Sequence, residues 1–189
     1  SAASDVYKRQ YLYKLIGYVP QKAVMFNGTV NSNIAYGDAK EVITDKAVKE
    51  AAKVAQADDF VSKMDDGYAS HIAQGGTNVS GGQKQRLAIA RAIAKNPEIY
   101  IFDDSFSALD YKTDAVLREE LKKYTKDATS LIVAQRIGTI MNADKIIVLD
   151  NGTSVGVGTH EELLKSCEVY KEIALSQLSK EELDNAKTK

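Results

Sequence analysis

Residues 79–110 read VSGGQKQRLAIARAIAKNPEIYIFDDSFSALD, and this stretch decides the fold. Its Ser-Gly-Gly turn opens a predicted helix over Gln83–Lys95, which Asn96-Pro97 ends. The run Ile99–Phe102 is continuously apolar, which is typical of a strand buried on both faces of a parallel sheet. Two carboxylates and a Ser-Ala-Leu-Asp turn follow that strand directly. The stretch therefore predicts an α/β fold with polar residues at the end of a buried strand.

Length and composition bound the class of protein. The chain has 189 residues, 44% of them hydrophobic and 27% charged, which is ordinary for one soluble globular domain or most of a larger one. A net charge of −1 argues against a nucleic-acid partner that depends on a basic surface. The single cysteine, Cys167, excludes an internal disulfide and fits a reducing compartment. We find neither a secretory signal peptide nor an apolar run of the ~18 residues that span a bilayer, so we expect a soluble, cytosolic chain.

Strands and helices alternate along most of the chain, as in an α/β core. We expect three domain parts: a lead over 1–10, a domain over 11–178 with a helical lobe at about 30–80, and a loose tail over 179–189. Asn151-Gly152 predicts a hairpin, and Thr159 with Glu162 predicts a capping box. The other expected elements are helices over Glu41–Gln56, Asp58–Met64 and Thr113–Tyr124, strands over Leu15–Val19, Ser130–Ala134 and Lys145–Leu149, and a surface loop over Gly67–Val79.

The Ser80-Gly81-Gly82 turn is a candidate anion site. The first amides of a helix lack partners inside the helix and lie at the positive end of its dipole, and glycines let a phosphate approach the backbone. Taken alone, the turn favours a flexible loop capped by serine. We favour the phosphate interpretation because Gln-Lys-Gln-Arg and the carboxylate strand follow it.

Asp103 and Asp104 are candidates for metal binding and for catalysis. A carboxylate at the C-terminal end of a parallel strand can hold Mg²⁺, and the residue after it can orient or deprotonate an attacking water. The alternative is an N-cap for the next helix, which Asp also favours. One Asp would satisfy that alternative, so the pair favours the metal interpretation.

These motifs resemble the nucleotide-binding domain of ATP-binding cassette (ABC) exporters, and the resemblance runs from Ile16 to about Gln177. It implies a partial P-loop NTPase core, with a mostly parallel sheet and an α-helical lobe. The matching segments are Gly17–Gln21 (glutamine loop), Phe26–Val30 with Asn33-Ile34 (exporter segment), Val79–Gln83 (signature), Ile99–Asp103 (Walker B), Ser107–Asp110 (D-loop), Ala134–Arg136 (switch region) and Gly158–Leu163 (exporter C-terminal segment).

Four departures from the family pattern matter. The chain contains no G-x-x-x-x-G-K-[ST], so the Walker A loop and the adenine platform, which would precede residue 10, are missing. Asp104 stands where the family has its catalytic Glu, Gln135 where it has the switch His, and Gln74 where exporters usually have Glu. His71 and His160 do not fill the switch position, and we interpret both as surface residues. The Asp104 and Gln135 departures resemble the degenerate half of heterodimeric exporters.

The resemblance implies ATP and Mg²⁺ as cofactors, together with a role for each site residue. Asp104 and Gln135 would take the catalytic positions, and Gln21 and Asp103 would contact the metal. The nucleotide-binding set would be Val79, Ser80, Gly81, Gly82, Gln83 and Asp110.

The implied partners are a second ABC subunit, in a heterodimer, and a transmembrane domain, which would place the chain at the cytoplasmic face of the cell membrane. One hypothesis is therefore that the chain is one ATPase half of an export pump, and that the 189 residues alone are inactive. The other is a non-hydrolysing nucleotide-binding module that regulates or joins a dimer. A DNA-repair ABC ATPase ranks third, because neither coiled-coil heptads nor a basic face is present.

Overall fold

The computed structural model describes residues 2–37 and 42–177, and the chain forms two compact units, 1–133 and 134–189. The elements of the first unit are α1 (Ala2–Leu15), β1 (Ile16–Val19), β2 (Gly28–Thr29), α2 (Val30–Ile34), α3 (Asp45–Val54), α4 (Asp58–Val61), η1 (Gly67–Ala69), β3 (His71–Ile72), η2 (Gln74–Gly76), α5 (Gly81–Ala94), β4 (Ile99–Asp103), α6 (Tyr111–Tyr124) and β5 (Thr129–Val133). Those of the second are α7 (Ile137–Ile140), β6 (Ile146–Asp150), β7 (Thr153–Gly158), α8 (His160–Ser166) and α9 (Glu168–Gln177).

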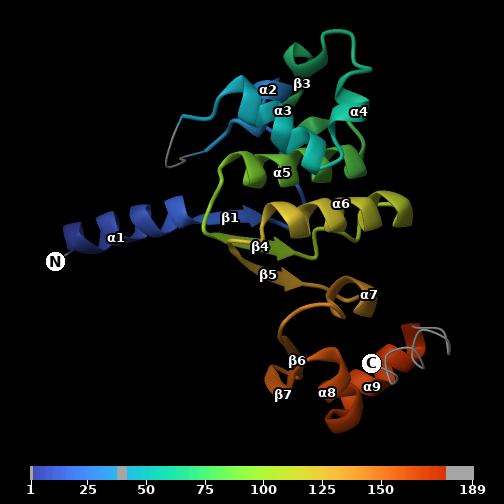
Figure 1. The fold of residues 1–189 in the computed structure, drawn as a ribbon. Coiled ribbons are helices and arrows are strands. Elements are labelled where there is room, and N and C mark those ends of the chain that lie inside the picture. Colours follow the sequence, from blue (N-terminus) through green and yellow to red (C-terminus); the bar gives the residue numbers. More distant parts are fainter. Residues whose placement is uncertain (1, 38–41, 178–189) are drawn as a thin grey trace. The chain divides into compact units, whose positions relative to one another are not determined.

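A three-stranded parallel sheet in the order β1-β4-β5 organises the first unit (Figure 1), and it confirms the predicted parallel α/β core. Because all three strands run the same way, their carboxyl ends meet at one edge, where Val19, Asp103 and Val133 lie. The β1 strand needs glycine at position 17, since a Cβ there would lie 2.7 Å from the Cγ of Pro97.

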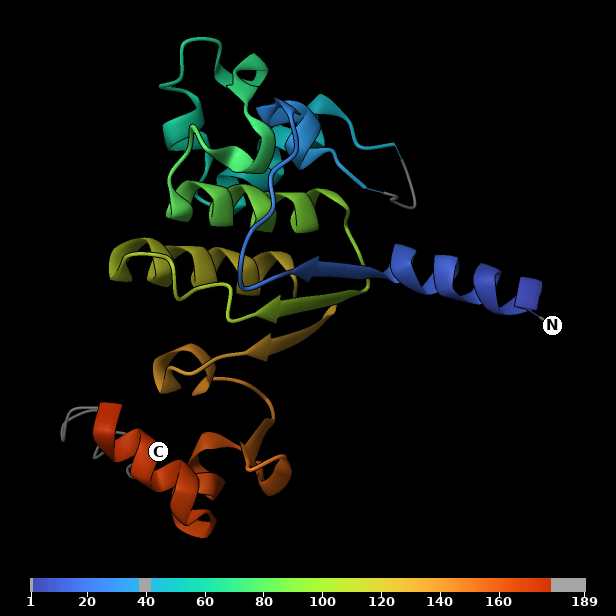
Figure 2. The same cartoon turned by 180° about the vertical axis from the view of Figure 1, so that it is seen from behind.

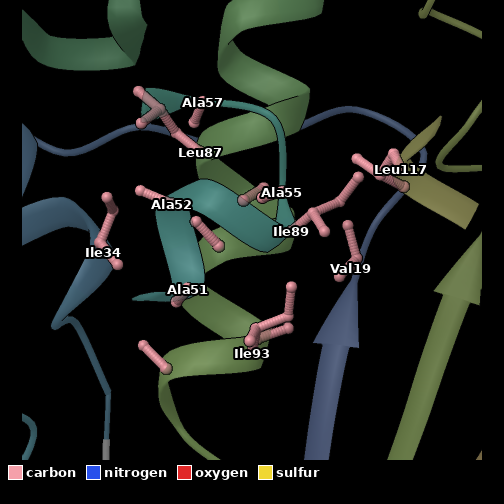
Figure 3. Close-up of a cluster of buried hydrophobic side chains, with 14 of the residues drawn as sticks. Val19, Ile34, Ala51, Ala52, Ala55, Ala57, Leu87, Ile89, Ile93 and Leu117 are labelled. Carbon is pink, nitrogen blue, oxygen red and sulfur yellow. The ribbon is translucent and has the colours of Figure 1, made fainter. Parts of the chain in front are cut away.

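Helices α5 and α6 lie on the same side of this sheet, as both views show (Figures 1 and 2). The core forms there: Val19 of β1 and Leu117 of α6 gather with Ile89 and Ile93 of α5 (Figure 3). The other sheet face is open, with Tyr18 and Leu131 each 53% exposed and Val133 50% exposed. The predicted burial of β4 on both faces is therefore wrong, because residues on one face are only partly covered.

The helical lobe packs on α5, and Ala51 and Ala52 of α3, with Ala55 directly after it, contribute to the interface (Figure 3). The lobe differs from the sequence-based expectation in two places. Of the helix predicted over Glu41–Gln56, Glu41 lies outside the described residues. The helix begins at Asp45, because Thr44 caps it by accepting a hydrogen bond from the Ala47 amide (3.2 Å). Val42, expected on its inner face, is 91% exposed. The loop predicted over Gly67–Val79 contains two 3₁₀ turns and strand β3, which pairs with β2.

The second unit contains the predicted hairpin and capping box. β6 and β7 pair antiparallel around Asn151-Gly152, whose φ angles of 48° and 79° place both residues in the left-handed region. The Thr159 hydroxyl accepts from the Glu162 amide, and the Glu162 side chain accepts from the Thr159 amide (2.8 Å). His160, interpreted as a surface residue, is buried: its Nδ1 is 2.7 Å from the Tyr170 hydroxyl, because α9 packs against α8.

The two chain ends differ in how far the structure describes them. Residues 2–10, expected to be a lead, lie within helix α1. The tail expected over 179–189 lies outside the described residues. No helix in the parts of the chain that the structure describes is both long and apolar enough to cross a bilayer.

Candidate functional site

The signature segment Val79–Gln83 forms the start of helix α5. Ser80 is the N-cap: its hydroxyl accepts from the Gln83 amide (3.2 Å), and Gln83 Oε1 accepts from the Ser80 amide (2.9 Å). The capping role considered for Ser80 is therefore real, and Gln83 takes part in the same cap. Val79, the residue before this cap, is half-buried and packs against the core.

Gly81 and Gly82 carry the first amides of α5, ahead of the first helical bond, which the Lys84 amide makes to the Ser80 carbonyl (2.9 Å). Gly81 is exposed, and a Cβ built there meets no atom within 4 Å. A Cβ on Gly82 would lie 3.4 Å from the carbonyl oxygen of Ala108 in the D-loop. An added Cβ would thus enter open space at Gly81 and make an ordinary van der Waals contact at Gly82, beside amides that have no partner inside the helix.

The D-loop ends at Asp110, which caps α6 by accepting from the Thr113 amide (3.0 Å). Hydrogen bonds from Thr113, and more weakly the charge of Arg86, lower the pKa of Asp110. Because Asp110 caps α6, neither Asp103 nor Asp104 does so, and the N-cap alternative for that pair is wrong.

Asp103 is the last residue of β4, and Asp104 follows it at the carboxyl edge of the sheet. The Tyr18 hydroxyl donates to Asp103 Oδ2 (3.1 Å), and this hydrogen bond is the main reason why the pKa of Tyr18 is raised. Gln21 Nε2 donates to Asp104 Oδ2 (3.1 Å). The glutamine loop and the Walker B strand, 83 residues apart in sequence, thus meet here.

Asp104 has a φ of 44°, in the left-handed region that Asp tolerates better than most residues. Its amide donates to the Val133 carbonyl (2.9 Å) and extends the β4–β5 ladder by one residue. The ladder fixes the Asp104 backbone, so a longer or shorter side chain at this position cannot easily be offset by a backbone shift.

Two buried polar residues that the sequence did not single out position this edge. Ser105, fully buried, donates from its hydroxyl to the Val19 carbonyl (2.8 Å), and Gln85 of α5 donates to the Pro20 carbonyl (3.1 Å). Together they tie the end of β1 to the end of β4 and to the signature helix. Their signal in the sequence is weak, since each is one polar residue within a motif that has another use.

The exporter segment is fastened to α5 through Arg91, which the sequence also gave no reason to select. Its guanidinium donates to the Asn33 carbonyl (2.7 Å), to Asn33 Oδ1 (3.1 Å) and to the Val24 carbonyl (3.0 Å). It also lies over the rings of Phe26 and Tyr36. Gln74, the fourth departure, accepts from the Asn27 amide (3.1 Å) and so joins the turn before the signature segment to the exporter segment.

Gln135 lies in the second unit, just before α7. Its side chain is exposed, and its carbonyl accepts from Gln177 Nε2 (2.9 Å). The Oε1 of Gln177 accepts from the Ile137 amide (2.9 Å), so one side chain of α9 holds the backbone on both sides of Arg136. The structure brings Gln21, Asp103 and Asp104 together within the first unit and fixes the backbone at Gln135 within the second.

The side-chain oxygens at the end of β4 suit a Mg²⁺ ion that phosphate groups and waters would also ligate. Among the described residues no group of three or more His, Cys, Asp or Glu side chains could hold a metal by itself. Mg²⁺ is commonly bound through one or two carboxylates, with waters and substrate phosphates completing its shell. Asp103 and the side-chain oxygen of Gln21 would fit that requirement.

Comparison with known proteins agrees with this geometry. The family model described as ABC transporter matches residues 2–107. An uncharacterized ABC transporter ATP-binding protein of Mycobacterium tuberculosis is 50% identical over 172 residues, covering 90% of this chain and 29% of that protein. A putative multidrug export ATP-binding/permease protein of Staphylococcus aureus is 44% identical over 158 residues, covering 84% of this chain and 27% of that protein.

A solved structure of a bacterial Atm1-family ABC exporter with ATP bound superposes with a TM-score of 0.85 at 37% identity. The match covers 91% of this chain and 30% of that one. The chain therefore spans less than a third of the length of each of these three proteins.

Proposed function

This chain belongs to the ABC transporter family, as an ATP-binding domain, and from that premise we propose that it serves an exporter with two unequal ATP sites. In this proposal its own site binds ATP but hydrolyses it slowly, and its signature segment completes a faster site on a partner subunit. The observation that carries the proposal is the contrast between an intact, open signature start at Gly81 and the substituted positions Asp104 and Gln135.

The slow site follows from the chemistry of two side chains. Asp104 is one methylene shorter than Glu, so its oxygens fall back by about 1.5 Å, and misplacement by about 1 Å can cost about 10²-fold in rate. The φ of 44° and the ladder bond to Val133 oppose a compensating backbone shift. Gln135 can donate a hydrogen bond to a phosphate oxygen, but it cannot carry the charge of an imidazole or transfer a proton. Binding thus survives where hydrolysis slows.

Within this site each residue has a distinct task. Asp103 and Gln21 would hold Mg²⁺, which when bound supplies positive charge to the phosphates. Asp104 orients the attacking water and accepts its proton. Gln21 Nε2 donates to Asp104 Oδ2 (3.1 Å), so the two side chains contact each other directly.

The partner's site uses the other end of the domain. Ser80, Gly81 and Gly82, with Val79, Gln83 and Asp110 supporting them, would close over ATP held by the partner. The start of α5, where Gly81 and Gly82 carry no side chains, offers amides and a positive dipole end to a phosphate. A carboxylate placed there would repel it.

We assign the rest of the exporter by analogy with relatives named as ATP-binding/permease proteins. In this proposal, closure driven by ATP changes the conformation of a transmembrane domain. The ATP-binding domain lies at the cytoplasmic face of the membrane, and its partners include no nucleic acid. The competing proposal is a nucleotide-binding module that joins or regulates a dimer without hydrolysis. An intact signature start favours the first, because a module that never completes a hydrolytic site has no need for it.

Single-turnover ATPase measurements on the full transporter with its partner test the proposal. Changing the partner's catalytic Glu to Gln should abolish nearly all turnover, whereas Asp104→Asn should cost little. Asp104→Glu with Gln135→His should raise hydrolysis at this subunit's site. If Asp104→Asn is as damaging as the partner's change, the unequal-site proposal is wrong; if no variant or parent hydrolyses ATP, the regulatory module is the better account.

A further inference from the structure

The hydrogen bond between Tyr18 and Asp103 joins two strands across the open sheet face. Tyr18 pairs with Ile101 in the β1–β4 register, and Asp103 lies two residues beyond Ile101 on the same strand. Side chains two residues apart on a strand share a face, so Tyr18 and Asp103 are diagonal neighbours. The phenolic oxygen reaches Asp103 Oδ2 at 3.1 Å.

We propose that Tyr18 is a positioning residue for the metal-binding carboxylate of Asp103. The inference rests on the proposed function, since it gives the Asp103 carboxylate a role toward a divalent cation held with nucleotide. The hydroxyl engages Oδ2 and so fixes the carboxylate plane, leaving Oδ1 to face a hydrated cation. Partners of this kind orient ligating carboxylates in many metal sites, and losing one typically costs 10–100-fold in metal affinity or activity.

The chemistry of the donor supports this role. A lysine or arginine at position 18 would hold Asp103 as firmly, but its positive charge would oppose binding of a cation beside it. A neutral hydroxyl orients the carboxylate and leaves its full negative charge for the metal. The neighbouring carboxylate is treated the same way, because Asp104 receives the neutral amide of Gln21. The end of β1 and the loop after it therefore supply one uncharged donor to each acid.

Burial separates this role from a structural one. The Tyr18 side chain is 53% exposed, whereas its neighbours Gly17 and Val19 are buried and carry the packing of β1. Removing the hydroxyl alone deletes no buried surface. Tyr18→Phe should therefore change metal binding without a matching loss of stability.

The test measures Mn²⁺ binding by electron paramagnetic resonance in the full transporter, with a non-hydrolysable ATP analogue. The partner subunit carries a change that removes its own metal-binding carboxylate, so nucleotide-dependent Mn²⁺ reports this subunit's site. We expect Tyr18→Phe to raise the Mn²⁺ dissociation constant about tenfold. Affinity for the analogue without metal and the thermal midpoint should both stay at the parent's values.

Tyr68→Phe is the matched control, because the Tyr68 hydroxyl also donates to a carboxylate, Asp58 Oδ1 (2.6 Å), in the helical lobe. It should leave the Mn²⁺ dissociation constant unchanged. If the parent binds Mn²⁺ with nucleotide and Tyr18→Phe matches it within about twofold, the inference falls and the proposed function stands. If the parent shows no nucleotide-dependent Mn²⁺ binding, both fall.

Discussion

Replacing Arg91 with Met should detach the exporter segment from the signature helix. The guanidinium now donates to three acceptors: the Asn33 carbonyl (2.7 Å), Asn33 Oδ1 (3.1 Å) and the Val24 carbonyl (3.0 Å). It also lies 5.3 Å from the centroid of the Phe26 ring and 5.6 Å from that of Tyr36. Burial lowers the pKa of Arg91 to about 10, so the group remains charged at neutral pH while its desolvation offsets part of these contacts.

The three acceptors contribute unequally to the expected loss. The Val24 carbonyl lies at an exposed position and can turn to water, and Asn33 Oδ1 keeps the Phe26 amide as a donor (2.9 Å). The Asn33 carbonyl loses its donor, and Asn33 as a whole is only 1% exposed. A buried acceptor without a donor costs about 1–3 kcal/mol. Two cation–π contacts add about 0.5–1 kcal/mol each. We expect Arg91→Met to lower the free energy of unfolding by about 3 kcal/mol.

Urea unfolding followed by circular dichroism measures this loss. Arg91→Lys should lie between parent and Met, because lysine keeps the charge but not the forked donor geometry. Arg136→Met is the control, since it makes the same change at an exposed position and should stay within about 0.5 kcal/mol of the parent. A loss below about 1 kcal/mol for Arg91→Met, with an unchanged slope against urea, would refute the assigned role of Arg91.

Gly81→Asp should reduce ATP hydrolysis of the full transporter to near background while leaving the thermal midpoint in place, because the added side chain enters open space; steady-state ATPase activity and calorimetric melting check both. Acidification should destabilise the second unit: burial lowers the pKa of His160, so the unfolded chain takes up the proton first and the free energy of unfolding falls as pH drops below about 6.5. Urea titrations at pH 5 and pH 7.5 should show that fall, and His160→Gln should remove it. The 189-residue chain alone should show no micromolar MgATP binding by calorimetry, because its sequence holds no phosphate-binding G-x-x-x-x-G-K-[ST] loop; micromolar binding would contradict this.

The sequence predicted the elements whose local signals agree with their tertiary surroundings. Pro97 ends α5, Asn151-Gly152 turns the hairpin, and Thr159 caps α8, because each effect acts within a few residues. The start of α3 was predicted wrongly because two local signals disagree there. Apolar spacing alone extended the helix to Glu41, while the cap at Thr44 outweighed it.

Tertiary contacts account for what the sequence did not reveal. The sequence predicted the carboxylate pair, but the donors that hold it come from Tyr18 and Gln21, 85 and 83 residues away. Likewise His160 follows a polar cap and precedes two glutamates, and nothing local shows that Tyr170 covers it. A register and a packed helix partner decide such contacts, and neither is visible in a window of ten residues.

The two ends of the candidate site differ in what their side chains are committed to. A Cβ added at Gly81 would meet no atom within 4 Å. We therefore expect a side chain there to affect a molecule that binds from outside the chain. Asp104 is held by Gln21 and by the β5 ladder, so a change there acts within this domain. If the fast hydrolysis belongs to the partner's site, Gly81→Asp must reduce turnover far more than Asp104→Asn does. Equal effects would place both residues at one and the same hydrolytic site, and the two ends of the domain would then not serve different nucleotides.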